Sequence, residues 1–125
     1  MSDVQSQARS ILDAMDLAWS QKNVDGVVAL FNQDATLESP LVVRFLNRSE
    51  GICSGSDDIR KMIAELMRRG LPWGKHSEPM VLGATIAVEF SSATDGHPFS
   101  VDIIELKNGK IQSLRAYTGW RALPK

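Results

Sequence analysis

Asp102 is the residue of this chain whose type and surroundings are best suited to chemistry. It lies in residues 99–107, which are predicted to form a strand, and residues two apart in a strand share a face. Asp102 therefore shares its face with the apolar Ile104 and Leu106. Burial among apolar side chains raises the pKa of a carboxyl group, which prepares it to donate a hydrogen bond or to act as a base near neutral pH. The alternatives are pairing with a buried Tyr or Arg, or a position in water near the strand end.

The two histidines lie in surroundings that are less suited to chemistry than those of Asp102. His76 lies beside Trp73 in a connector rich in Gly and Pro, where it would either reach a ligand at a pocket mouth or stay on the surface. His97 stands next to Pro98 in a turn and is expected in solvent. Two isolated histidines in separate turns do not predict a metal site.

Size and composition restrict the class of protein. The 125 residues predict one domain, residues 1–125, and 14 basic against 15 acidic residues without a block of one sign predict no nucleic-acid partner. Cys53 is the single cysteine, so no internal disulfide forms, and a reducing, cytoplasmic compartment fits best. Charged residues interrupt the first twenty positions and no apolar run approaches about 20 residues, so we expect neither a signal peptide nor a membrane span.

Three helices are predicted from apolar spacing and end signals. Residues 4–19 repeat apolar side chains at helical intervals, and a shorter helix follows Asn23 as N-cap and ends at residues 32–34. The third begins at Ser56, carries acidic residues in its first turn and basic residues in its last, and stops at Gly70.

The remaining segments predict strands. Residues 35–39 are predicted to form a short strand that Pro40 ends. Residues 41–55 are ambiguous and are treated as a loop with some strand, in which 41–45 could extend the pairing. Residues 80–93, 99–107 and 110–120 follow as three antiparallel strands, with a type I′ turn at Asn108 and Gly109. Helices segregated from a meander of strands indicate an α+β fold.

Several segments together resemble a known group of proteins. These are residues 25–31 (Asp-Gly-Val-Val-Ala-Leu-Phe), residues 34–40 (Asp-Ala-Thr-Leu-Glu-Ser-Pro), Ser-Gly before the third helix, and residues 108–111 leading to 114–117. They resemble the ketosteroid isomerase and SnoaL-like polyketide cyclase group of the nuclear transport factor 2-like superfamily. The resemblance spans nearly the whole chain and implies a cone-shaped, cystatin-like domain, in which a curved antiparallel sheet and three helices enclose an apolar pocket. It also implies a homodimer.

The residues that act in relatives carry over only in part. Ser39 stands where ketosteroid isomerases have a carboxylate base, and Met15 stands where they have an oxyanion-hole tyrosine. Asp102 aligns with their second oxyanion-hole group, a carboxylic acid kept neutral. Steroid isomerisation by the usual arrangement is therefore not expected. Limonene epoxide hydrolases need an Arg and two Asp, and here Ala87 and Ala116 occupy two of those three positions.

The resemblance directs one face of the last strand toward the pocket and thereby suggests ligand contacts. Glu38, Arg115 and Tyr117 fall out of phase with that face and are expected to point toward solvent, a packing neighbour or a second chain. Ser39 is expected to be a small wall residue, since no His is placed to activate it. The expected ligand contacts are Met15, Trp19, Ser39, Trp73, His76, Phe90, Leu114, Ala116, Thr118 and Trp120. Of these, Met15, Trp19, Phe90 and Trp120 would otherwise be core residues.

Two functions follow as hypotheses. In the first, a SnoaL-like pocket binds a small, mostly apolar molecule and Asp102 is the catalytic acid or base of an isomerase, cyclase or hydrolase-like lyase without metal or organic cofactor. In the second, the domain binds a hydrophobic ligand or mediates dimerisation without catalysis, as the residues at Met15 and Ser39 favour. The apolar Val101 and Ile103 on the outer face predict a homodimer in either case.

Overall fold

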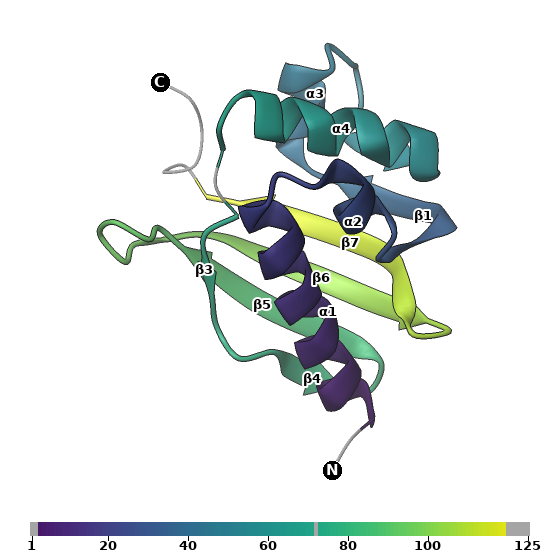
Figure 1. The fold of residues 1–125 in the computed structure, drawn as a ribbon, viewed down its shortest axis with the longest axis vertical. Helices are drawn as coiled ribbons and strands as arrows, with labels where there is room; N and C mark the ends of the chain where they lie inside the picture. Colours follow the sequence, from purple (N-terminus) through teal and green to yellow (C-terminus); the bar gives the residue numbers. More distant parts are fainter. Residues whose placement is uncertain (1–2, 72, 120–125) are drawn as a thin grey trace.

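The computed structural model of the chain describes residues 3–71 and 73–119. That part contains helices and strands in an order typical of an α+β fold (Figure 1). The helices are α1 (Asp3–Ser20), α2 (Val24–Val28), α3 (Pro40–Phe45) and α4 (Ser56–Arg68). The strands are β1 (Phe31–Glu38), β2 (Ile52–Ser54), β3 (Lys75–His76), β4 (Met80–Leu82), β5 (Thr85–Ser91), β6 (Pro98–Lys107) and β7 (Lys110–Thr118).

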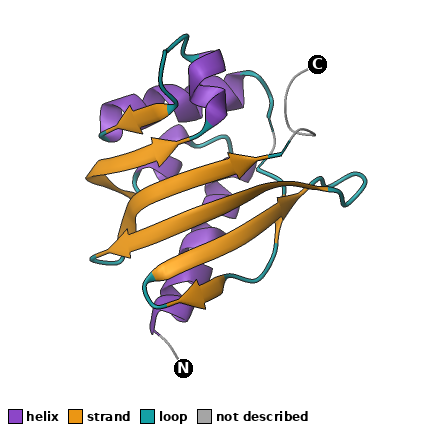
Figure 2. Ribbon diagram, turned by 180° about the vertical axis from the view of Figure 1, so that it is seen from behind, coloured by secondary structure: helices purple, strands orange, loops and turns teal. Residues whose placement is uncertain are grey.

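One curved, open sheet contains all seven strands. Its order is β2-β1-β7-β6-β5-β3, and β4 pairs with β5 beyond this path. β1 and β7 run parallel, whereas the other neighbours are antiparallel. The helices lie on one face of the sheet, and no helix of the described residues lies on the opposite face of β5, β6 and β7 (Figure 2). The core therefore forms between the helices and the inner face.

The three helices expected from the sequence are confirmed. α1 buries Ala8, Leu12 and Met15 along one side. The Asn23 side chain caps α2 by accepting a hydrogen bond from the Gly26 amide at 2.9 Å. α4 begins at Ser56, and the chain leaves it through a glycine of positive φ. Local side-chain spacing and caps determine these elements, and therefore the sequence predicts them well.

A fourth, short helix replaces part of the expected loop and strand. Residues 41–45 belong to α3, which starts at Pro40, a residue that has no amide hydrogen to leave unpaired in a first helical turn. The Ser39 hydroxyl caps this helix by accepting from the Leu41 amide at 3.2 Å. The prediction that residues 41–45 extend a strand was therefore wrong. Strand pairing resumes only in β2.

Two strand boundaries also differ from the expected ones. Residues 32–34, expected as a helix exit, are part of β1. The single long strand predicted for residues 80–93 is instead a hairpin of β4 and β5, because Gly83 turns the chain at φ 64°. A continuous apolar run gives no sequence signal for such a turn. Leu82, which belongs to this run, lies in solvent with 85% of its surface exposed.

Candidate functional site

A cavity of about 130 Å³ lies between the helices and the inner face of the sheet. Its volume is close to that of an engineered cavity of about 150 Å³ that accepts benzene. The walls are mostly apolar or aromatic. The lining residues are Met15, Trp19, Phe31, Leu37, Ser39, Leu41, Met62, Ile63, Leu66, Trp73, Phe90, Phe99, Ser100, Asp102, Leu114, Ala116 and Thr118.

Strand register places Asp102 in the middle of the inner face. On β6 it lies opposite Val88 of β5 on one side and opposite Ala116 of β7 on the other. Ser100 and Ile104 precede and follow it on the same face, since side chains alternate along a strand. The small Ala116 leaves room beside the carboxyl group, and its other neighbours on the sheet are largely apolar.

The surroundings of Asp102 favour its neutral form. The residue is only 6% exposed, and burial raises the pKa of its carboxyl group to about 7. The Ser100 hydroxyl donates a hydrogen bond to Asp102 Oδ1 at 3.1 Å, which opposes the rise without cancelling it. Both protonation states are therefore populated near neutral pH.

Asp102 is the one ionisable side chain among the described residues that line the cavity. Within residues 3–71 and 73–119, no group of three or more His, Cys, Asp and Glu side chains could hold a metal ion. The chemistry available at the cavity wall is accordingly that of one carboxyl group, with hydroxyl groups from Ser39, Ser100 and Thr118 nearby.

Three aromatic rings form one wall of the cavity. Trp73 lies between Trp19, at 5.5 Å between ring centroids, and Phe90, which it meets at 4.5 Å in an edge-to-face arrangement. The indole N–H of Trp19 donates to the Leu71 carbonyl at 3.1 Å. The indole nitrogen of Trp73 is buried and has no hydrogen-bond partner among the described residues.

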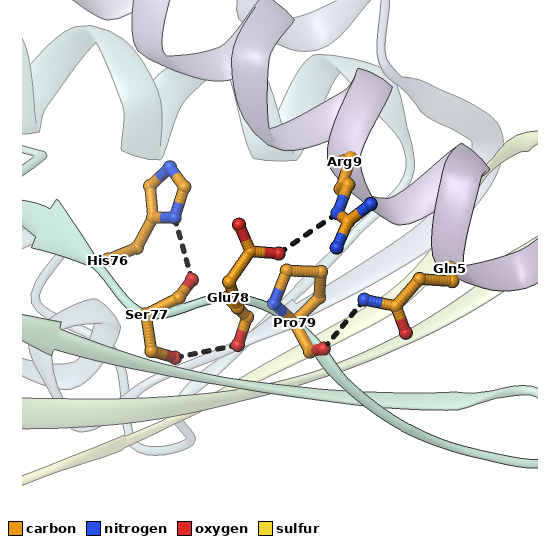
Figure 3. A network of polar contacts seen from close by, with 6 residues as sticks. All are labelled: Gln5, Arg9, His76, Ser77, Glu78 and Pro79. Atoms are coloured by element: carbon orange, nitrogen blue, oxygen red, sulfur yellow. Dashed lines mark hydrogen bonds and ion pairs between the residues drawn. The ribbon is translucent and has the colours of Figure 1, made fainter.

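Several contacts with α1 fasten the connector, residues 73–79. Arg9 pairs with Glu78 at 2.9 Å, and the Gln5 amide donates to the Pro79 carbonyl at 3.1 Å (Figure 3). These contacts come from residues four apart on one side of the helix. They hold the connector, and with it Trp73, against the body of the domain.

His76 is one of the connector residues that contact α1, and it does not line the cavity. Its Nε2 lies 2.8 Å from Asp16 of α1, and its Nδ1 lies 3.0 Å from the Ser77 carbonyl oxygen (Figure 3 shows the latter contact). Burial lowers the pKa of His76, but the hydrogen bonds to Ser77 and Asp16 and the nearby charge of Asp13 raise it more, so the pKa lies above its usual value. His76 lines instead an open hollow of about 510 Å³, to which Trp19 and Trp73 also contribute, and its contact with a ligand stays a prediction.

The structure brings together most of the residues that the sequence suggested. Trp120 lies outside the described residues, and His76 lies in the connector away from the lining. The others all line the cavity: Met15, Trp19, Ser39, Trp73, Phe90, Leu114, Ala116 and Thr118. Whether they contact a ligand stays a prediction.

Ser100 is the polar lining residue that the sequence reasoning missed. It precedes Asp102 by two positions and therefore shares its face, a signal that was available in the strand pattern. The α4 residues Met62, Ile63 and Leu66 were visible only as a buried helical face. That they border the cavity depends on how α4 packs across the sheet.

The cavity adjoins an open groove at one end. Ser39, Ala116 and Thr118 line both the cavity and a groove of about 510 Å³. Arg115 and Tyr117 also border this groove. Arg115 lies 3.0 Å from Glu105, and Tyr117 is 61% exposed.

Comparisons with known proteins identify the fold. No family model and no curated protein matches the chain. Among solved structures, a SnoaL-like protein of unknown function from Burkholderia thailandensis is similar with a TM-score of 0.77, 14% identity and coverage of 92% of this chain and 96% of that one. TerC, co-crystallised with polyporic acid, has a TM-score of 0.72 at 13% identity, with 93% and 94% coverage. A putative polyketide cyclase from Sinorhizobium meliloti has a TM-score of 0.63 at 18% identity, with 86% and 93% coverage.

Other similar structures are described as NTF2-like, so the curved, open sheet with helices on one face defines a nuclear transport factor 2-like fold. The SnoaL-like protein from Burkholderia thailandensis, at 14% identity, shares this fold. The fold expected from the sequence resemblance is confirmed. None of the helices in the described ranges is long and apolar enough to cross a membrane.

Proposed function

We propose that the cavity binds a small, mostly apolar molecule and that Asp102 exchanges a proton with it, as an isomerase or cyclase requires. The observation that carries this proposal is the position of Asp102. Its carboxyl group borders an apolar cavity, is 6% exposed and has the Ser100 hydroxyl as its hydrogen-bond partner among the described residues. A buried carboxyl group facing an otherwise apolar cavity is a functional candidate, since its burial lowers stability.

Proton transfer next to a carbonyl group suits one such residue. The Asp102 carboxylate would take a proton from the carbon beside the carbonyl, which leaves an enolate and a neutral acid. In a β,γ-unsaturated carbonyl compound the enolate is conjugated with the double bond, so return of this proton to the γ-carbon shifts the double bond and isomerises the molecule, with no change in its oxidation level. A pKa of about 7 lets the same group take up and release the proton near neutral pH.

Two similar structures support this substrate class. TerC was co-crystallised with polyporic acid, and the Sinorhizobium meliloti protein is described as a putative polyketide cyclase. At 13% and 18% identity these proteins share the fold with this chain, so their ligands support the proposal as analogies only.

The proposal is tested by hydrogen–deuterium exchange at the methyl group of acetophenone in D₂O, followed by ¹H NMR. The wild-type protein should accelerate exchange over Asp102→Asn by about 10²- to 10⁴-fold, the range typical of a positioned general base. The rate should rise with pH and level off above the pKa of Asp102, because the carboxylate is the active form.

Ser100→Ala is the matched control for the role of the carboxylate. Loss of the Ser100 hydrogen bond removes the interaction that lowers the pKa of Asp102, so the midpoint of the rate profile should move to higher pH. Equal exchange by wild type and Asp102→Asn at every pH would contradict proton transfer by Asp102.

A non-catalytic ligand-binding domain is the second candidate function. The observation that favours it is that no other ionisable side chain among the described lining residues could act with Asp102 as a second acid or base. The same experiment separates the two functions. Binding of acetophenone without accelerated exchange identifies a binding domain.

A further inference from the structure

The cavity approaches the surface of the molecule at two places. It is only partly enclosed, and the residues that line both the cavity and a surface depression mark these places. Ser39, Ala116 and Thr118 line both the cavity and the groove described above. Trp19 and Trp73 line both the cavity and the open hollow beside the connector. These are the candidate openings among the described residues.

Side-chain size distinguishes the two places. On the side of the hollow, the rings of Trp19 and Trp73 lie 5.5 Å apart between centroids, and Phe90 packs against Trp73 at 4.5 Å. The Trp19 indole is also held in place, since its N–H donates to the Leu71 carbonyl at 3.1 Å. The three residues shared with the groove have small side chains instead. Less side-chain volume therefore separates the cavity from the groove than from the hollow.

Strand pairing explains why the wall is thin beside the groove. β1 pairs with β7 as far as the register pair of Glu38 and Arg115, and it then leaves the sheet because Pro40 starts α3. From Ala116 onward, β7 has β6 on one side and no described strand on the other. The groove lies along this gap, and α3 borders it through Pro40 and Val43.

The register of the inner face sets the order in which a ligand meets the groups around it. Ser100 of β6 lies between Phe90 of β5 and Thr118 of β7. Asp102 follows on the same face of β6, and its partner on β7 is Ala116. The aromatic wall near β5, the carboxyl group on β6 and the groove at β7 thus succeed one another in steps of about 4.8 Å. A molecule that crosses the strands has its middle beside Asp102.

The charges at the groove favour a neutral ligand chain. Arg115 and Glu38 are the charged residues among the described groove lining. Arg115 lies 3.0 Å from Glu105, which offsets its charge, whereas Glu38 is an exposed carboxylate. An acidic substituent would be repelled by these carboxylates, while Pro40 and Val43 offer apolar surface to a neutral one.

We propose that the cavity opens into the groove past Thr118, and that its ligands are neutral carbonyl compounds with a ring on one side of the carbonyl group and a chain on the other. The ring occupies the cavity, whose volume of about 130 Å³ suits a single ring. The carbonyl group lies beside Asp102, and the chain passes Ala116 into the groove. The inference rests on the proposed function in taking this cavity as the ligand site, and it adds the shape of the substrate.

Acetophenone and hexanophenone test the proposal, because they share the ring and the carbonyl group and differ by four methylene groups in the chain. If an open groove removes about half of the added surface from water, hexanophenone should bind wild type about tenfold more tightly in an NMR titration. A cavity without this opening has no room for the longer chain. Weaker binding of hexanophenone than of acetophenone would therefore overturn the inference.

The position of the chain is measured in ¹H–¹⁵N spectra of the same samples. Backbone amide signals that shift with hexanophenone and not with acetophenone report contact with the chain. These should include Glu38, Gly51 and Tyr117, which line the groove. Shifts at Ser20 and Lys75 instead would place the chain in the hollow and overturn the inference.

Thr118→Phe should close the opening, because residue 118 is the last of β7 and lies beyond Ala116. Hexanophenone should then lose its advantage, and the ratio of the two affinities should fall about tenfold. Thr118→Val is the matched control, since Val and Thr side chains are nearly equal in size, and it should keep the wild-type ratio. A wild-type ratio in Thr118→Phe, with a spectrum that shows the variant to be folded, would contradict passage of the chain past this residue.

The outcomes separate this inference from the proposed function. Exclusion of hexanophenone, together with binding of acetophenone and exchange that depends on Asp102, overturns the opening and leaves proton transfer standing. Binding of both ketones with shifts in the groove, but without exchange that depends on Asp102, supports the opening and contradicts proton transfer. Binding of neither ketone at millimolar concentration overturns both the opening and the proposed ligand cavity.

Discussion

Burial of Asp102 makes the stability of the protein depend on pH in a definite direction. The unfolded chain ionises this carboxyl group near its usual pKa of 3.8, whereas the folded protein keeps it protonated up to about pH 7. Between these values the native state binds the extra proton, so the free energy of unfolding decreases as pH rises. Below about pH 4 the carboxyl group is neutral in both the folded and the unfolded state, so it does not lower the free energy of unfolding.

Asp102→Asn should therefore stabilise the protein at neutral and alkaline pH. Relative to wild type, the free energy of unfolding of the variant should increase by up to about 4 kcal/mol between pH 4 and pH 8, as a shift of about three pKa units implies. Urea denaturation of both proteins across this range measures the difference.

Other shifted carboxyl groups provide an internal control. Hydrogen bonds from Arg48 and Arg68 hold the pKa values of Asp58 and Glu65 at about 2. The contributions of these two carboxylates to the free energy of unfolding are therefore present above pH 4 and are lost as pH falls toward 2. Both proteins share these groups, and the difference between them isolates Asp102. A difference that is flat between pH 4 and pH 8 would contradict the buried, neutral form of Asp102.

At the scale of single residues, the sequence predicts which face of a strand a side chain points to better than it predicts which residues contact one another. Alternation along one strand was enough to place Asp102 opposite in direction to Ile103, and the structure agrees. The contact of His76 with Asp16 joins residues far apart in the chain, and no local pattern encodes it. The unpaired nitrogen of Trp73 likewise depends on the surrounding fold.

The element that most affects the site is the connector, and Gly74 determines where it lies. Both the positive φ of Gly74 and the close approach of Ser91 and Phe99 exclude a side chain at this position. Gly83 also has a positive φ, but a Cβ atom there would meet nothing within 4 Å. Substitutions at the two glycines therefore distinguish the cost of backbone strain, which both positions share, from the cost of close packing, which applies only to Gly74.

Gly74→Ala should destabilise the protein more than Gly83→Ala. The left-handed conformation costs each variant about 1–2 kcal/mol, and crowding against β5 and β6 should add roughly another 1 kcal/mol at position 74. Urea denaturation gives the two values. Only Gly74→Ala should also alter the tryptophan fluorescence of the folded protein, because it displaces Trp73, and equal losses with unchanged fluorescence would contradict this role of the connector.

Elements with strong local signals were predictable, and those set by tertiary packing were not. α1 and α4 follow from apolar spacing and end charges. α3 replaces an expected strand because Pro40 both ends β1 and starts a helix, a choice that the sequence alone does not decide. The turn at Gly83 was concealed within an apolar run.

At the scale of the whole molecule, the outer face of the sheet is the surface that the described helices leave uncovered. By strand alternation, Val101 and Ile103 of β6 and Tyr117 of β7 belong to this face, which no helix of the described residues covers (Figure 2). Tyr117 is largely exposed and the other two are half-buried. We propose that a second copy of the chain packs here, as the apolar outer face already suggested in the sequence.

Sedimentation equilibrium at micromolar concentration should give the mass of a homodimer for the wild-type protein. Ile103→Glu should shift the equilibrium toward the monomer, since it places a charge in the middle of the apolar face. Leu82→Glu, which changes an exposed apolar residue on β4, is the control and should stay dimeric. A monomeric wild type would contradict the proposed interface.

The parallel pairing of β1 with β7 has a consequence for how the chain acquires its structure. Leu37 lies opposite Leu114, so a strand near the beginning of the chain completes its hydrogen bonds only with the last described strand. The contacts that close the sheet are thus of high sequence separation, which slows folding. On the ribosome, β1 and the helices around it must wait until β7 has been synthesised before the inner face, and with it the cavity, can form.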